Sequence, residues 1–194
     1  MYPIHTGRCG ATASTVAGEM WAFSDESERA DLMLVGVVTV APGAAVDTRR
    51  ELRRLLLPGQ RRVHTAKESP RRRRALLDVV AALDLNATVF TTRRAPRQIR
   101  SDTRRDLIEA ACAHVIAAGA VSWTLDNQDP AQAERDRHTI AAVLGDAHHL
   151  VYDHRPSHDE PLLWAIDAIV WAVGAGPPWS KRVDKVTTVK RLAP

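Results

Sequence analysis

Runs of apolar and β-branched residues alternate along the chain with apolar stripes at helical spacing. Residues 21–24 and 31–40 indicate two strands. The short link between them predicts an antiparallel hairpin, because a parallel return needs a longer crossover. Further strand-like runs occupy residues 61–65, 86–92, 121–125 and 149–153.

Helices are expected between these strands and after the last of them. Helical spacing and capping residues indicate helices over residues 47–57, 70–83, 101–118, 130–144 and 161–173. Strands alternating with helices after a hairpin-like start predict an α/β fold, with a mixed sheet flanked by helices. The predicted organisation is a loose lead-in over residues 1–18, one domain over 19–176 and a basic tail over 177–194.

The composition is that of a globular protein, with 45% hydrophobic residues among 194. No apolar run approaches the roughly 18 residues that a membrane span requires, and the first residues lack the apolar block of a secretory signal. Two cysteines are too few for a disulfide framework. We therefore expect a cytoplasmic protein with no membrane partner, and the oligomeric state stays open.

The net charge of +4 comes mostly from arginines that occur in clusters. The clusters fall at residues 49–54, 61–62, 71–74 and 93–105. Guanidinium groups suit bidentate contacts with phosphates, so the clusters indicate a nucleic-acid partner, DNA or RNA. The alternative is an ordinary solvated helix face.

Four acidic residues stand beside apolar segments where a metal site could form. Asp25 and Asp126 each follow a strand-like run, Glu68 precedes a helix, and Asp167 interrupts the most apolar helix. A carboxylate among apolar neighbours is costly to bury unless a cation or a hydrogen bond compensates it. Hard cations such as Mg²⁺ or Mn²⁺ prefer carboxylate oxygens, and two such ions can drive phosphodiester hydrolysis.

Three short motifs resemble one known family. They are Phe23-Ser-Asp-Glu-Ser27, His64-Thr-Ala-Lys-Glu68 and Leu163-Trp-Ala-Ile-Asp-Ala-Ile-Val-Trp171. Together they are similar to elements of an uncharacterised bacterial RNase H-like family, domain of unknown function 3800. The resemblance implies an RNase H-like fold in which Asp25, Glu68, Asp126 and Asp167 bind the metal. Glu28 and Trp164 depart from the family pattern of Gly and Gln, which leaves a catalytically inactive relative as an alternative.

Basic residues flank the proposed site. His64 is a candidate for positioning the scissile phosphate or relaying a proton, and a loop histidine without such a role is the alternative. Lys67 and the four residues Arg71, Arg72, Arg73 and Arg74 are the candidate phosphate contacts. Arg72 and Arg73 are expected to be replaceable by alanine with little loss of folding stability.

Two other features invite a function. Residues 148–159 are rich in His and Asp, which are zinc ligands, although their spacing matches no established zinc pattern. His154 or His158 would more simply border the carboxylate site. Trp179 is the tryptophan most suited to a surface contact, because the other four lie in apolar patterns.

The leading hypothesis is a divalent-metal-dependent nuclease or phosphodiesterase that acts on a nucleic-acid backbone by two-metal-ion hydrolysis. The alternatives are an inactive RNase H-like protein that binds nucleic acid, and an interaction module whose arginines bind an acidic protein.

Overall fold

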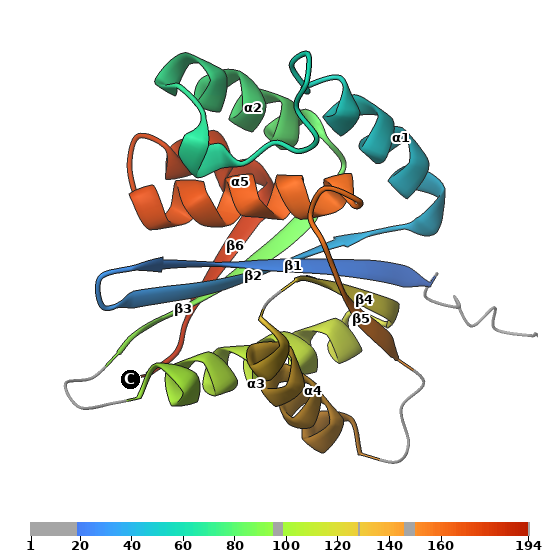
Figure 1. Ribbon diagram of the computed structural model, residues 1–194, viewed down its shortest axis with the longest axis vertical. Helices are drawn as coiled ribbons and strands as arrows, with labels where there is room; N and C mark the ends of the chain where they lie inside the picture. Colours follow the sequence, from blue (N-terminus) through green and yellow to red (C-terminus); the bar gives the residue numbers. More distant parts are fainter. Residues whose placement is uncertain (1–18, 95–98, 128, 146–149, 194) are drawn as a thin grey trace, which may run out of the picture.

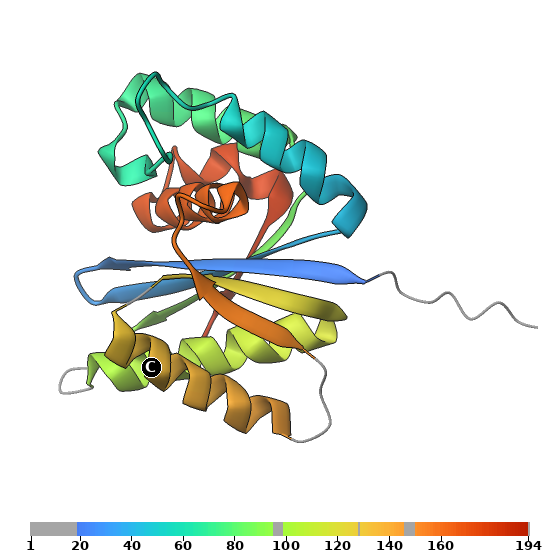
Figure 2. The same ribbon diagram turned by 45° about the vertical axis from the view of Figure 1, so that its right-hand side comes forward.

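The computed structural model describes residues 19–94, 99–127, 129–145 and 150–193. They form a six-stranded mixed sheet in the order β5-β4-β1-β2-β3-β6, with helices on both faces (Figures 1 and 2). The strands are β1 (Met20–Arg29), β2 (Leu32–Val40), β3 (Asn86–Arg93), β4 (Ala120–Asp126), β5 (Val151–Arg155) and β6 (Thr187–Arg191). The helices are α1 (Pro42–Arg53), α2 (Pro70–Ala82), α3 (Arg100–Ala117), α4 (Pro130–Leu144) and α5 (Pro161–Ala175). This arrangement confirms the predicted α/β fold with a mixed sheet.

The predicted N-terminal hairpin is present and longer than expected. β1 and β2 pair antiparallel from Trp21 opposite Val40 to Arg29 opposite Leu32. The turn at Ala30 has a positive φ of 52°. The charged residues at the end of β1 have low strand propensity, but pairing along the whole of β2 holds them in the sheet.

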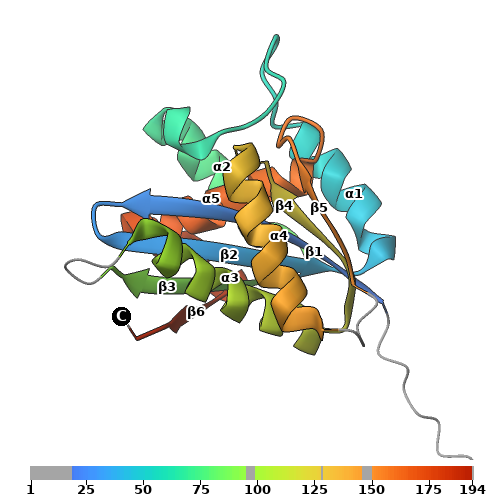
Figure 3. The same ribbon diagram turned by 60° about the horizontal axis from the view of Figure 1, so that its bottom comes forward.

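The two faces of the sheet are covered by different helices. α5 packs against β1 and β2, and α1 and α2 lie over α5, whereas α3 and α4 cover the opposite face (Figure 3). α5 is apolar nearly all round because it is buried between the sheet and the two outer helices. Within the described residues, no helix is long and apolar enough to cross a membrane.

The side chains of the two cores follow this layering. Phe23, Leu34 and Val38 point toward α5, whereas Ala22, Val35 and Val37 point toward α3. The alternation of side chains along a strand therefore assigns each residue of β1 and β2 to one layer. Asp25, two residues after Phe23, lies on the α5 side.

Gly36 is the position where α5 comes closest to the sheet. A Cβ atom there would lie 2.4 Å from Val170 Cγ2 and 2.6 Å from Ile166 Cδ1. We expect Gly36→Ala to lower the free energy of unfolding by about 1–3 kcal/mol, because the helix must move or the side chains must leave their rotamers. Urea unfolding measures this loss.

Gly43→Ala is the matched control for that variant. A Cβ atom at Gly43 would meet nothing within 4 Å, so its unfolding midpoint should stay close to that of the unchanged protein. Equal stability of the Gly36 and Gly43 variants would contradict the close approach of α5.

Some predicted boundaries were wrong. α1 begins at Pro42 rather than near residue 47, since proline at the first position needs no N–H partner, and it ends at Arg53. Residues 61–65 form no strand and lead into a 3₁₀ turn, Thr65–Lys67. Side chains satisfy the backbone there: Asp167 accepts from Thr65 N at 2.8 Å, and Arg73 Nε donates to Thr65 O at 2.9 Å.

The C-terminal segment is more ordered than a tail. Part of it forms β6, which pairs in parallel with β3 from Ala87 opposite Thr187 to Thr91 opposite Arg191. Trp179 is half-buried rather than free on the surface, and its ring stacks edge-on against Trp171 at 5.2 Å.

Candidate active site

Two of the four predicted carboxylates come from neighbouring parallel strands. β1 and β4 pair with Ser24 opposite Leu125, so the next residues, Asp25 and Asp126, lie side by side. Ser24 and Leu125 face the α3 layer, where Trp123 Nε1 donates to Ser24 Oγ at 2.9 Å. Strand alternation therefore turns both carboxylates toward α5.

α5 supplies the third carboxylate. Asp167 follows Ile166, which packs at Gly36. Its Oδ2 accepts the Thr65 N–H at 2.8 Å, and its Oδ1 lies 3.4 Å from Nδ1 of His64. The loop before α2 therefore orients Asp167 and places the imidazole of His64 beside it.

These residues line one open cavity of about 140 Å³. The lining comprises Asp25, Glu26, Arg62, Val63, His64, Asp126, Ser157, Leu163, Trp164 and Asp167. Three of the four predicted carboxylates thus meet, together with an imidazole and a guanidinium. We call this cavity the carboxylate cavity.

Burial and mutual repulsion dominate the electrostatics of the carboxylate cavity. Burial, and then the charges of Asp167 and Asp126, raise the pKa of Asp25 well above its usual range, and Arg62 and Arg104 oppose this only in part. Burial also raises the pKa of Asp126, against the Asn127 N–H and Arg62. A cation bound between these groups would relieve both effects.

Asp25→Asn is expected to raise the melting temperature at pH 7. A raised pKa means that the folded state binds the proton more tightly than the unfolded state, so stability falls as pH rises from about 4 through the raised value. Asparagine does not ionise, so the variant avoids this loss of stability. Its gain in melting temperature over the unchanged protein should shrink as the pH is lowered toward 4. Circular dichroism melts across this pH range test the expectation.

Asp153→Asn, at an exposed carboxylate on β5 with 62% of its side chain accessible, is the control and should change little at any pH. An Asp25 variant less stable than the unchanged protein at pH 7 would show that the carboxylate is compensated in the folded state.

Glu68 does not join the other three carboxylates. Its Oε2 accepts from Arg72 Nε at 2.8 Å, and its Oε1 accepts from Gln60 Nε2 at 3.1 Å. Glu68 is not one of the described residues that line the carboxylate cavity. The predicted convergence of four carboxylates is therefore wrong for Glu68, because an arginine one helical turn away pairs with it.

The arginines at the start of α2 divide into two kinds. Arg72 also donates to Leu55 O at 2.7 Å, and Arg73 donates to Thr65 O and Ala66 O while its guanidinium lies 4.6 Å from the Trp171 ring centroid. These two hold the loop before α2, so the expectation that alanine replaces them without loss of stability conflicts with the structure. Arg71, Arg74 and Lys67 are exposed.

Arg62, Ser157 and Trp164 also line the cavity, and the sequence did not assign them to the site. Arg62 reaches the cavity from the loop before α2, and its guanidinium donates to Ser157 Oγ. Trp164, which stands where the resembled family has Gln, is buried and donates from Nε1 to Ser157 O. Its side chain therefore holds the loop before α5 in place. The cluster Arg61-Arg62 was the one available indication of Arg62.

A buried ionic network lies behind the site, on the α3 side of the sheet. Arg104 of α3 donates to both oxygens of Asp136 at 3.0 and 2.8 Å and pairs with Glu26. His154 Nε2 lies 3.3 Å from Asp136 Oδ2. Burial favours a raised pKa for Asp136, but hydrogen bonds from His154, Arg104 and Gln132 outweigh it and lower the pKa to about 2.

The histidines of residues 148–159 that the structure describes neither line the carboxylate cavity nor form a metal site. His154 serves Asp136 and does not line the carboxylate cavity, and His158 lies 3.4 Å from Asp159. His148 and His149 lie outside the described residues. Across residues 19–94, 99–127, 129–145 and 150–193, no group of three His, Cys, Asp or Glu side chains is arranged to hold a metal ion.

The donor chemistry of the carboxylate cavity nevertheless suits a hard divalent cation. Asp25, Asp126 and Asp167 offer only oxygen ligands, which Mg²⁺ and Mn²⁺ prefer. Burial and neighbouring carboxylates raise the pKa of Asp25 and of Asp126, so a cation at this place would offset unfavourable negative charge. The carboxylate cavity therefore suits Mg²⁺ or Mn²⁺ in the type of its ligand atoms and in its charge.

The chain matches no family model and no curated protein sequence. Among solved structures it is similar to the crystal structure of RNase H1 from the halophilic archaeon Halobacterium salinarum. The sequence identity is 14%, the TM-score is 0.37, and the match covers 78% of this chain and 97% of that chain. The resemblance to the family of domain of unknown function 3800 stays a prediction from the residue motifs.

Proposed function

We propose that the carboxylate cavity is the active site of a divalent-metal-dependent nuclease or phosphodiesterase with an RNase H-like arrangement. The observation that supports this proposal most is the meeting of Asp25, Asp126 and Asp167 with Arg62 and His64 in one cavity. Acidic residues that repel one another beside a guanidinium suit a phosphate bridged to the protein by cations.

Each side chain has a distinct task in this proposal. Asp25, Asp126 and Asp167 would hold Mg²⁺ or Mn²⁺, which would supply Lewis-acid stabilisation of the phosphate and activation of a water. Arg62, anchored by Ser157, binds a non-bridging oxygen of the scissile phosphate. His64, oriented by Asp167 at 3.4 Å, holds or transfers a proton at its free Nε2.

Exposed cations of the loop before α2 and of α2 itself position the strand in this proposal. Lys67, Arg71 and Arg74 lie on the 3₁₀ turn and the first turns of α2 and are accessible to phosphates. Such contacts fix the register of a nucleic acid without reading its sequence. Glu68 enters the metal site only if its bonds to Arg72 and Gln60 break.

A cleavage assay tests the proposal. Labelled single-stranded and double-stranded DNA and RNA, and a DNA–RNA hybrid, are incubated with the protein and Mg²⁺ or Mn²⁺. We expect hydrolysis of at least one substrate that EDTA abolishes and added metal restores. No hydrolysis of any substrate with either ion would contradict the proposal.

The engagement of Glu68 by Arg72 and Gln60 favours a second candidate, an inactive relative that binds nucleic acid. This candidate predicts binding that weakens steeply with salt and no cleavage under the same conditions. An interaction module for an acidic protein predicts neither effect with nucleic acid.

A further inference from the structure

A large cavity of the described structure lies away from the carboxylate cavity. It measures about 430 Å³, lies between β2, β3, β6 and the C-terminal part of α5, and shares no lining residue with the carboxylate cavity. This volume is within the range of small-molecule sites. The proposed nuclease site does not use this cavity, which we call the β6 cavity.

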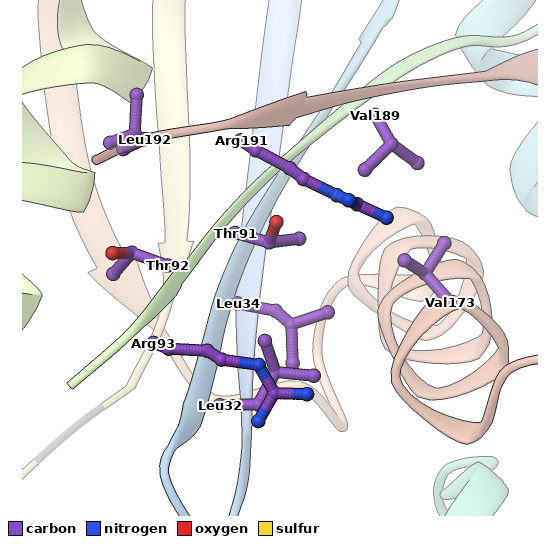
Figure 4. A pocket seen from close by; sticks show the side chains of 9 residues that line it. All are labelled: Leu32, Leu34, Thr91, Thr92, Arg93, Val173, Val189, Arg191 and Leu192. Atoms are coloured by element: carbon purple, nitrogen blue, oxygen red, sulfur yellow. The ribbon is translucent and has the colours of Figure 1, made fainter. Parts of the chain in front are cut away.

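The floor and walls of the β6 cavity are apolar. Leu32 and Leu34 of β2 face α5, Val173 of α5 stands opposite, and Val189 of β6 lines the outer side (Figure 4). Val189 is 47% exposed, whereas Leu34 is fully buried. An accessible apolar surface backed by a rigid sheet suits the apolar part of a ligand.

Two guanidinium groups border this apolar surface. Figure 4 shows Arg191 and Arg93 extending from the sheet toward α5, with Thr91 and Leu34 between them. Arg93 is paired with both oxygens of Asp31, at 2.9 and 2.8 Å. Arg191 forms no ion pair or side-chain hydrogen bond with the described residues. Arg191 is therefore a cation available to a ligand at the edge of an apolar cavity.

We propose that the β6 cavity binds an amphipathic monoanion, with the apolar chain against Leu34, Val173 and Val189 and the carboxylate on Arg191. A guanidinium binds a carboxylate through two parallel hydrogen bonds, which gives both strength and orientation. The Arg93–Asp31 pair is already neutral and forms the opposite rim.

A simpler explanation of Arg191 is protection of an edge. β6 ends the sheet, and charged residues on edge strands prevent pairing with other chains. That role applies equally to Lys190, whose side chain lies on the other face of β6, over the Phe90 ring at 5.7 Å. Edge protection needs no cavity, so it predicts the same effect for Arg191 and Lys190. A ligand site in the β6 cavity predicts an effect of Arg191 alone.

Calorimetric titration with decanoate, and with decanol as the uncharged analogue, tests the proposal. We expect decanoate to bind at one site, and decanol to bind about tenfold more weakly because it lacks the charge-assisted hydrogen bonds. Arg191→Ala should weaken decanoate binding by about the same factor. Val189→Asp, at a half-exposed position, should abolish binding while the protein stays folded.

Lys190→Ala is the matched control, since it removes the same charge from the next residue and should leave decanoate affinity unchanged. Absence of decanoate binding, or equal losses in the Arg191 and Lys190 variants, would overturn the proposal. So would self-association of the chain that Val189→Asp abolishes without any binding of decanoate, because the occupant would then be a second copy. None of these outcomes depends on nuclease activity.

Discussion

Asp25→Asn is expected to lower the rate of phosphodiester hydrolysis by about a thousandfold. Asp25 lines the carboxylate cavity together with Asp126 and Asp167, and burial together with these two charges raises its pKa. Asparagine keeps the shape but removes a charged oxygen ligand, and losing a preorganised electrostatic group of this kind costs about 10²–10³ in rate. Single-turnover cleavage with saturating metal measures the loss.

The same variant should be at least as stable as the unchanged protein at pH 7, so misfolding cannot explain its inactivity. Asp153→Asn on β5 is the matched control and should keep full activity. An Asp25 variant within about tenfold of the unchanged rate would exclude Asp25 from the chemistry.

Glu68→Gln addresses the fourth predicted carboxylate in the same assay. A loss as large as that of Asp25→Asn would show that Glu68 leaves Arg72 and enters the site during turnover. Activity near the unchanged rate, with a lower unfolding midpoint, would show that Glu68 only holds Arg72 and Gln60 in place.

Arg104→Ala is expected to lower the free energy of unfolding by about 3–5 kcal/mol, the cost of breaking a buried ion pair from one side. The side chains of Arg104 and Asp136 are only 5% and 2% exposed, and two hydrogen bonds join them. Without Arg104, Asp136 and Glu26 lose their shared counter-charge. Urea unfolding at pH 7 gives the loss.

The deficit of Arg104→Ala should shrink as pH falls below about 4. The pKa of Asp136 is lowered to about 2, so this carboxylate contributes stability above its unfolded pKa and loses that contribution as pH falls toward 2. Arg105→Ala removes the same charge from the next residue, which is 54% exposed, and should cost less than about 1 kcal/mol. Equal losses at both positions would contradict the buried network.

The apolar pattern predicted much of the fold because each strand and helix covers a core. The α5 helix and the β1–β2 hairpin follow directly from their apolar runs, although the charged end of β1 does not, since only pairing with β2 holds it extended. β6 was missed because its five residues are largely exposed and polar. Its strand conformation depends on the hydrogen bonds that β3 offers.

The sequence predicted the three carboxylates that meet in the cavity. Asp25 and Asp126 each follow an apolar run that forms a strand, and these two strands are neighbours in the sheet. Asp167 is the single charged residue of an apolar helix. Glu68 shows the limit: it lies four residues before Arg72, where a local ion pair competes with the cavity, and only the tertiary structure decides between the two.

The contacts of Arg62 and Arg104 could not be predicted from the sequence, because their partners are distant along the chain. The Arg62–Ser157 contact joins residues 95 positions apart, and the Arg104–Asp136 pair joins two helices. Such pairs form only when the layers assemble, so no local pattern in the chain records them.

Mn²⁺ binding followed by electron paramagnetic resonance tests most directly whether Asp25, Asp126 and Asp167 form one divalent cation site. We predict saturable binding by the unchanged protein, competition by Mg²⁺, and loss of binding in Asp25→Asn and Asp167→Asn but not in Asp153→Asn. No saturable Mn²⁺ binding, or binding that survives the loss of both Asp25 and Asp167, would contradict the account.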